Sequence, residues 1–141
     1  MKNKILFAKS GYSFFDSTLK INDIICIAKE NEVGSIALID NSNLFGAMEF
    51  YKSCLKEGIK PIIGMQINYL ENNGKTYPLI LIAKDVYGYK TLCKLTEVVS
   101  KGSLNVCIDK EDLVNYKSGI SLIMPISKSY LKVIDEDQFA D

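Results

Sequence analysis

The apolar positions along the chain follow two alternating periods, and together they predict strands and helices in turn. Short apolar runs bounded by polar residues indicate buried strands at residues 4–8, 35–40, 59–69, 77–84 and 119–124. Between the first two runs, apolar residues recur at i, i+3, i+4 and i+7. This spacing predicts an amphipathic helix that ends near residues 31–34, with an inner face made of Ile21, Ile24, Ile25 and Ala28.

Three further helices are expected from caps and apolar stripes. Asn43 is a candidate cap for a second helix, which ends at Gly58 and has the predicted inner stripe Leu44, Met48, Tyr51 and Leu55. Asp85 is a candidate cap for a third helix, with Leu92, Leu95, Val98 and Val99 facing inward. Asp109 and Asp112 form a capping-box pattern for a short helix, and residues 127–134 favour a last one.

This order of elements predicts an α/β fold with a mostly parallel sheet flanked by helices. Residues 72–75 contain Asn-Gly, the usual hairpin turn signal. Parallel sheets bind ligands at the carboxyl ends of their strands, so candidate site residues lie at 9–16, 40–43, 65–69 and 84–85. No glycine-rich phosphate loop follows any predicted strand, which disfavours the common kinds of nucleotide binding.

Composition narrows the chemistry further. The chain has 141 residues and 15.8 kDa, the size of one domain, with 48% apolar residues and 17 positive against 17 negative charges. All the positive residues are lysines, and histidine, arginine and tryptophan are absent. The lack of histidine excludes a Ser-His-Asp triad and any histidine-ligated metal site. A neutral net charge without arginine argues against strong independent nucleic-acid binding.

Compartment and thiol chemistry follow from the same counts. No apolar run reaches the length of a membrane span or of a signal-peptide core, so we expect a cytoplasmic protein that has no membrane partner. The four cysteines, Cys26, Cys54, Cys93 and Cys107, contain no Cys-x-x-Cys pair. We expect them to be buried free thiols.

Three sequence segments in a fixed order carry a family resemblance. They read Ser-Gly-Tyr-Ser-Phe-Phe-Asp at 10–16, Ala-Leu-Ile-Asp-Asn-Ser-Asn-Leu-Phe-Gly-Ala-Met-Glu-Phe-Tyr at 37–51, and Gly-Ile-Lys-Pro-Ile-Ile-Gly-Met-Gln-Ile at 58–67. Together they resemble the polymerase and histidinol phosphatase (PHP) domain family, most closely the N-terminal PHP domain of bacterial DNA polymerase III α subunits. The resemblance extends from residue 5 to about residue 124. It implies the first half of a distorted PHP-type (β/α) barrel.

The resemblance also implies where a metal site would lie. Active members of the family hold metal ions for phosphoester chemistry with histidines and carboxylates at the strand ends. The matching positions here are Phe7, Lys9, Asp40, Asn41 and Gln66, and only Asp40 keeps a charged oxygen ligand. A phenyl ring donates no ligand, an amide is a weak one, and Lys9 places an ammonium where a cation would sit. We therefore expect a degenerate site with no catalytic residue, no metal and no cofactor.

Several residues allow more than one interpretation. Asp40 could be a surviving metal ligand, but we favour a bond to a loop or an internal salt bridge to Lys9. Asp16 and Glu49 could form an acid–base pair, but turn and helix-surface roles are favoured. A group of aromatic residues could stack on nucleic-acid bases. We prefer loop packing or contact with a neighbouring domain for this group, which consists of Tyr12, Phe14 and Phe15. Three lysines could contact the phosphates of a nucleic acid, but we prefer the interpretation that they form the solvent-exposed side of a helix. They are Lys52, Lys56 and Lys60.

The resemblance implies a function at the level of a larger protein. We expect residues 1–141 to be a partial, non-catalytic PHP-like segment at the N-terminus of a polymerase III α subunit, a DNA-directed DNA polymerase (nucleotidyltransferase) of DNA replication. Its expected partner is the remainder of that subunit, and a proofreading or clamp-associated replisome subunit is a further candidate. Two alternatives remain: a metal-dependent phosphoesterase or exonuclease with a rearranged site, and a stand-alone interaction module.

Overall fold

The computed structural model describes residues 3–101 and 107–125, in which helices and strands alternate for most of the length. The elements in order are β1 (Asn3–Ala8), α1 (Ile21–Glu30), β2 (Val33–Asn41), α2 (Ala47–Lys56), β3 (Lys60–Leu70), β4 (Thr76–Ala83), α3 (Val86–Lys101), β5 (Cys107–Ile108), α4 (Lys110–Asn115) and β6 (Ile120–Ile123). The helix predicted at residues 127–134 lies outside the described residues. Within them, no helix is both long enough and apolar enough to cross a membrane.

The strands among these elements all belong to a single mixed sheet. The strand order is β1-β2-β3-β4-β6, and β5 pairs with β3. The pairs β1–β2, β2–β3 and β3–β5 are parallel, whereas β3–β4 and β4–β6 are antiparallel. The prediction of a mostly parallel sheet is therefore wrong for the second half. The short turn at residues 71–75 gives the reason for the β3–β4 pair, because a parallel pair would need a crossover of a dozen or more residues.

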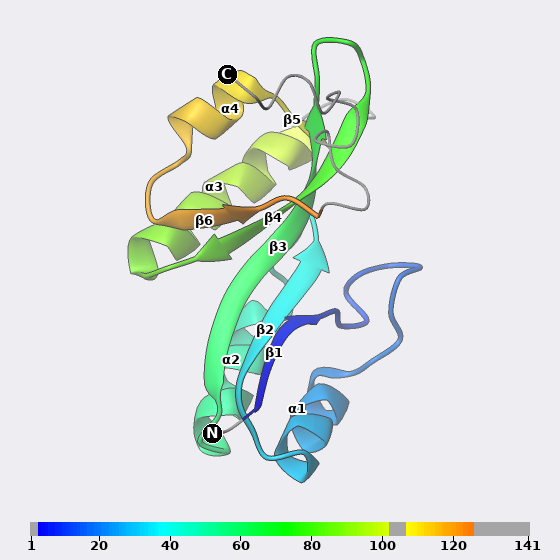
Figure 1. The fold of residues 1–141 in the computed structure, drawn as a ribbon, viewed down its shortest axis with the longest axis vertical. Helices are drawn as coiled ribbons and strands as arrows, with labels where there is room; N and C mark the ends of the chain where they lie inside the picture. The colour runs from blue at the N-terminus through cyan, green and yellow to red at the C-terminus, as the bar shows by residue number, and fades with distance from the viewer. Residues whose placement is uncertain (1–2, 102–106, 126–141) are drawn as a thin grey trace, which may run out of the picture.

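The long strand β3 joins two parts of the molecule (Figure 1). At one end, β1 and β2 lie beside it with α1 and α2, and at the other end β4, β6, α3 and α4 gather around it. Side chains alternate along the strands, and register places Leu38, Ile63, Met65 and Leu81 on the same face. The helices α1, α2 and α3 pack on that face. The other face of the sheet carries a smaller cluster: Ala37, Ile39, Ile80, Ile62 and Ile82.

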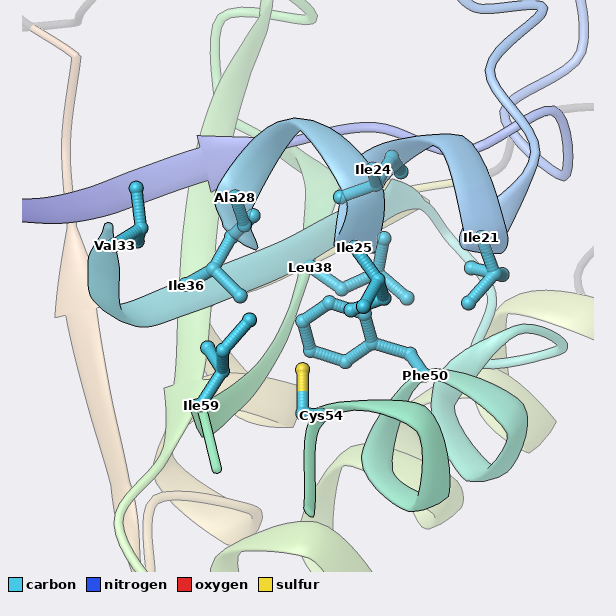
Figure 2. Packing of buried hydrophobic residues seen from close by; sticks show 10 residues of the cluster. All are labelled: Ile21, Ile24, Ile25, Ala28, Val33, Ile36, Leu38, Phe50, Cys54 and Ile59. Atoms are coloured by element: carbon cyan, nitrogen blue, oxygen red, sulfur yellow. The ribbon is translucent and has the colours of Figure 1, made fainter. Parts of the chain in front are cut away.

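The core under α1 and α2 is centred on Phe50, whose side chain is fully buried. Figure 2 shows its ring between α2 on one side and the side chains of Ile25 from α1 and Leu38 from β2 on the other, with the Cys54 sulfur beside it. All four residues predicted for the inner face of α1 are buried here, as expected. A second core lies under α3 and contains the predicted residues Leu92, Leu95 and Val99. The fourth predicted residue, Val98, is only partly buried and lies outside this core.

The predicted inner stripe of α2 is wrong. The helix buries Ala47, Phe50 and Cys54, whereas three residues of the predicted stripe are about half exposed: Met48 54%, Tyr51 45% and Leu55 55%. Two apolar stripes lie next to each other on this helix, and both have helical spacing. The α1–β2 core selects the stripe that carries the Phe50 ring.

Helix caps and cysteines were predicted with mixed success. Asp85 accepts a hydrogen bond from the Gly88 amide, and Asp109 forms the predicted capping box with Asp112. The described cysteines are free, and Cys54 is buried as predicted. Cys107 is partly buried, and the expected burial is wrong for Cys26 and Cys93, which are exposed. Their helices leave these positions on the outer side.

Candidate functional site

At the carboxyl end of β2, the buried carboxylate of Asp40 fastens the first loop to the sheet. Its Oδ1 accepts hydrogen bonds from the Ser10 amide (2.8 Å) and the Ser13 hydroxyl (2.6 Å), and its Oδ2 accepts one from the Ser10 hydroxyl (2.7 Å). Asp40 is only 2% exposed. A carboxylate at this depth needs such donors to offset its lost hydration. Asp40 therefore has a structural role, in agreement with the predicted bond to a loop.

A second polar cluster lies next to it and contains Lys9, Asp16 and Asn41. The Lys9 Nζ donates to Asp16 Oδ2 (2.7 Å) and to Asn41 Oδ1 (2.8 Å). The Asn41 Nδ2 donates in turn to the same Asp16 oxygen (2.6 Å). The three side chains thus form a closed triangle, which we call the Lys9 triangle. The side chain of Lys9 is 15% exposed and that of Asp16 is 48% exposed.

The ion pair that we hypothesised between Lys9 and Asp40 is not formed, because Lys9 pairs with Asp16 instead. Strand geometry gives the reason. Successive residues of a strand point to opposite faces, so Asp40 and Asn41 cannot present their side chains to the same side. Asp40 shares the helix-covered face with Leu38, and Asn41 is the neighbour that meets Lys9.

The remaining two ligand positions lie close to the same strand ends. The Phe7 ring is 47% exposed, and its centroid lies 5.6 Å from the Lys9 Nζ, a cation–π distance. Gln66 on β3 is in register with Asn41 on β2. The structure therefore brings Phe7, Lys9, Asn41 and Gln66 to one edge, as the family positions implied, with Asp40 directly behind them on the other face.

The donors at this edge do not suit a divalent metal ion. Metal sites for phosphoester chemistry need several anionic or imidazole ligands that converge on one point. Here the convergence point of Asp16 and Asn41 is occupied by an ammonium, and Phe7 supplies no donor atom. Across the described residues, no group of three or more Asp, Glu, Cys or His side chains is placed to hold a metal. No reaction step through a metal can be derived from these residues.

The aromatic residues of the first loop are mostly exposed. Phe14 is 70% exposed and Phe15 is fully exposed (108%), so neither packs into the loop. Tyr12 packs edge-on against Phe45 at 6.3 Å between ring centroids. The prediction of packing holds for Tyr12, whose partner Phe45 lies outside the loop, and does not hold for Phe14 and Phe15. Contact of Phe14 and Phe15 with a neighbouring domain stays a prediction.

The other candidate residues separate into two groups. Asp16 has a turn role as predicted, but it also belongs to the Lys9 triangle, whereas Glu49 lies on the exposed side of α2. The three lysines of the proposed solvated face are all exposed: Lys52, Lys56 and Lys60. Asn43 does not cap α2, whose N-cap is Gly46. Its side chain instead accepts from the Phe45 amide and donates to the Tyr12 carbonyl.

Ser10 and Ser13, the hydrogen-bond partners of Asp40, were not among the residues predicted from the sequence. Both are buried polar residues, 1% and 0% exposed. A usable signal existed, because an aspartate that ends a buried strand needs donors and the loop after the preceding strand contains two hydroxyls. That reasoning requires knowing that β1 lies beside β2, which only the folded sheet establishes.

The chain is similar in sequence to the α subunits of bacterial DNA polymerase III. The DNA polymerase III subunit alpha of Borreliella burgdorferi is 42% identical over 128 residues, covering 82% of this chain and 11% of the relative. The subunit of Bacillus subtilis is 35% identical over 132 residues, covering 90% of this chain and 12% of the relative. The chain thus spans about a tenth of the length of these relatives. The matching region is their N-terminal PHP domain.

Solved structures support the fold alone. An amidohydrolase from Chromobacterium violaceum, with bound sulfate and no metal, has a TM-score of 0.59 at 20% identity, covering 71% of this chain and 34% of that one. A candidate metal-dependent phosphoesterase from Bifidobacterium adolescentis has a TM-score of 0.53 at 12% identity, covering 83% and 44%. Both alignments include a much larger share of this chain than of the solved structure. Because the PHP domain family matches residues 6–138, more than nine-tenths of the sequence, the chain belongs to the PHP domain family.

Proposed function

We propose that this chain is the N-terminal PHP segment of a replicative DNA polymerase α subunit, and that its own role is structural. In this proposal the parent protein carries the DNA polymerase activity, and residues 1–141 form the first half of a PHP-type barrel that supports it. The segment binds no metal or other cofactor and acts in the cytoplasm. Its principal partner is the remainder of the subunit, with a proofreading or clamp-associated subunit as a second candidate.

The observation that carries the structural role is the chemistry of the strand ends. An ammonium bonded to Asp16 and Asn41 stands where the family resemblance implies metal ligands. The buried Asp40 carboxylate accepts three hydrogen bonds from Ser10 and Ser13, with both of its oxygens engaged. These bonds tie the carboxylate to the first loop, which supports a structural role for it.

The observation that supports the polymerase context is identity with the α subunits. The identities are 35–42% over most of this chain. A second observation agrees with this context, because several large apolar side chains are exposed in the described residues: Phe45, Met48, Tyr51, Leu55 and Tyr87. Apolar surface of this extent is typical of a segment that contacts further protein.

Two measurements test the proposal. An antibody against this segment, used to blot a lysate of the source cells, should detect a band several-fold heavier than 15.8 kDa. A band at 15.8 kDa would instead favour a stand-alone interaction module and remove the polymerase assignment.

Metal analysis tests the structural role. After incubation with Mn²⁺ or Zn²⁺ and dialysis, the chain should retain far less than one ion per molecule and should not hydrolyse a phosphomonoester. Retention near one equivalent, with hydrolysis abolished by Asp40→Ala, would establish the phosphoesterase alternative.

A further inference from the structure

We infer that the Lys9 ammonium is a built-in cation that fastens the first loop, residues 9–19, to the ends of β1 and β2 in place of a bound metal ion. This inference deepens the structural role proposed above and rests on it. It assigns a positioning task to the Lys9 triangle, which is separate from the buried bonds of Asp40.

The first argument is convergence on the ammonium. A carboxylate oxygen, an amide oxygen and an aromatic face approach the Lys9 Nζ from residues 16, 41 and 7. These groups come from the loop, from β2 and from β1, so a single positive charge joins three segments. Oxygen atoms and a π-face are the surroundings that a cation prefers.

The second argument concerns the role of Asn41. Its amide oxygen accepts from Lys9 while its amide nitrogen donates to Asp16. Both ends of the side chain are therefore used, and the amide orientation is fixed by the charges on either side. A carboxylate at this position could accept from Lys9 but could not donate to Asp16 unless it were protonated.

The third argument is the strained backbone next to Asp16. Phe15 has φ of +66°, a left-handed conformation that is costly for a bulky side chain. Its ring is fully exposed, so packing of the ring does not repay that cost. Such a conformation persists only where the surrounding contacts hold it, and Asp16 is the next residue in the chain.

The expected consequence is local. The amides of Gly11, Ser13, Asp16 and Ser17 donate to carbonyls within the loop. If the Lys9 triangle holds the loop down, removal of its charge should increase the open population of this loop without loosening α3.

Hydrogen exchange of the full chain, read by mass spectrometry, tests this inference. Lys9→Met should raise the exchange rate of residues 10–19 roughly tenfold, the ratio expected when hydrogen bonds to a charged group are lost. Lys9→Arg keeps the charge and should stay within about twofold of the unchanged chain. Lys52→Met, which removes an exposed lysine from α2, is the matched control and should change nothing in the loop.

Asp16→Asn provides a second route, because it weakens the same triangle from the loop side without altering the end of β1. If Lys9→Met does not fold, Asp16→Asn takes its place in the test and should raise the exchange rate of the same amides. Equal exchange in Lys9→Met, Lys52→Met and the unchanged chain would overturn the inference. So would slower exchange of the loop in the unchanged chain on addition of MnCl₂, because the ammonium would then not occupy the place of the ion.

A failure of this inference can be distinguished from a failure of the proposed polymerase context. A loop that loosens in Lys9→Met supports the built-in cation whether the native product is long or short. A heavy band on the blot supports the polymerase context whatever the loop does.

Discussion

At the scale of single residues, the strand ends carry charge at two depths. Asp40 is buried and held by neutral hydroxyl and amide donors, whereas Lys9 and Asp16 form an ion pair that is partly open to solvent. The deeper network should contribute more to stability, because an unsatisfied group there cannot turn to water.

Ser13→Ala should reduce the free energy of unfolding by about 1–3 kcal/mol. The Ser13 hydroxyl donates to Asp40 and also accepts from the Asn41 amide (3.1 Å), so both partners lose a bond. Urea denaturation measures the difference. The control Ser100→Ala, on the exposed side of α3, should change stability by less than about 0.5 kcal/mol. Equal effects of the two substitutions would show that the Asp40 network is not critical.

The buried Cys54 thiol should resist alkylation. Burial raises the pKa of Cys54 to about 11, so the reactive thiolate is scarce at pH 8. Iodoacetamide followed by mass spectrometry should label the exposed Cys26 and Cys93 first and Cys54 only in denaturant.

The same shift predicts the sign of a pH effect. Because the folded pKa of Cys54 lies above the ordinary value of 9.0, its contribution to stability is fully present below pH 9. It should decline as the pH rises towards 11, since the unfolded chain ionises first. Cys54→Ala should remove this part of the alkaline loss. An alkaline loss that is unchanged in Cys54→Ala would have another source.

At the scale of elements, the decisive features are the side that each helix buries and how closely elements approach. Helix α2 buries Phe50 and exposes its neighbour Tyr51. The start of α3 crosses the turn before β6 at Gly88 and Gly119, where no side chain fits.

Phe50→Ala should cost about 3–5 kcal/mol, because it empties the centre of the α1–α2 core. Tyr51→Ala, one residue further along the same helix, should cost less than about 1 kcal/mol. Thermal or urea unfolding of the two variants compares them directly. A larger loss for Tyr51→Ala would mean that α2 packs through the other stripe.

Gly88→Ala should destabilise the half of the sheet formed by β4 and β6 by about 2–4 kcal/mol. A Cβ on Gly88 would collide with the Gly119 carbonyl oxygen and come within 3.2 Å of the Ala83 Cα. Gly11→Ala is the control, since a Cβ there would meet nothing nearer than the Leu19 carbonyl oxygen at 3.6 Å. Urea denaturation should therefore separate the two variants, and similar losses would contradict the close crossing.

At the scale of the whole molecule, the described part of the chain leaves an apolar groove open between α2 and the start of α3. It has a volume of about 420 Å³, and its lining includes Met48, Tyr51, Ile63, Val86 and Tyr89. Exposed apolar surface of this kind promotes association between protein molecules.

The isolated chain should therefore self-associate as its concentration rises. Met48→Lys combined with Tyr51→Lys should reduce the association while leaving the unfolding midpoint nearly unchanged, because both side chains line the groove and are already about half exposed: 54% and 45%. Sedimentation velocity over a concentration series measures the effect. If the double variant associates as strongly as the unchanged chain, a surface other than this groove causes the association.

The sequence alone determined those features that depend on local physics. Helix periodicity identified the inner face of α1, and short polar caps identified the starts of α3 and α4. The absence of histidine and arginine limited the chemistry before any fold was known. Family motifs marked Lys9, Asp40 and Asn41 as neighbours at the strand ends.

Only the tertiary structure decided which neighbours pair and which stripe is buried. The alternation of side chains along β2 sends Asp40 to Ser10 and Ser13 and sends Asn41 to Lys9, an outcome that depends on where β1 and its loop lie. On α2, two apolar stripes had equal helical spacing, and the α1–β2 core selected the one with Phe50. Which side chains pair, and which of two equally spaced stripes is buried, depends on segments distant in sequence, so local patterns cannot decide either one.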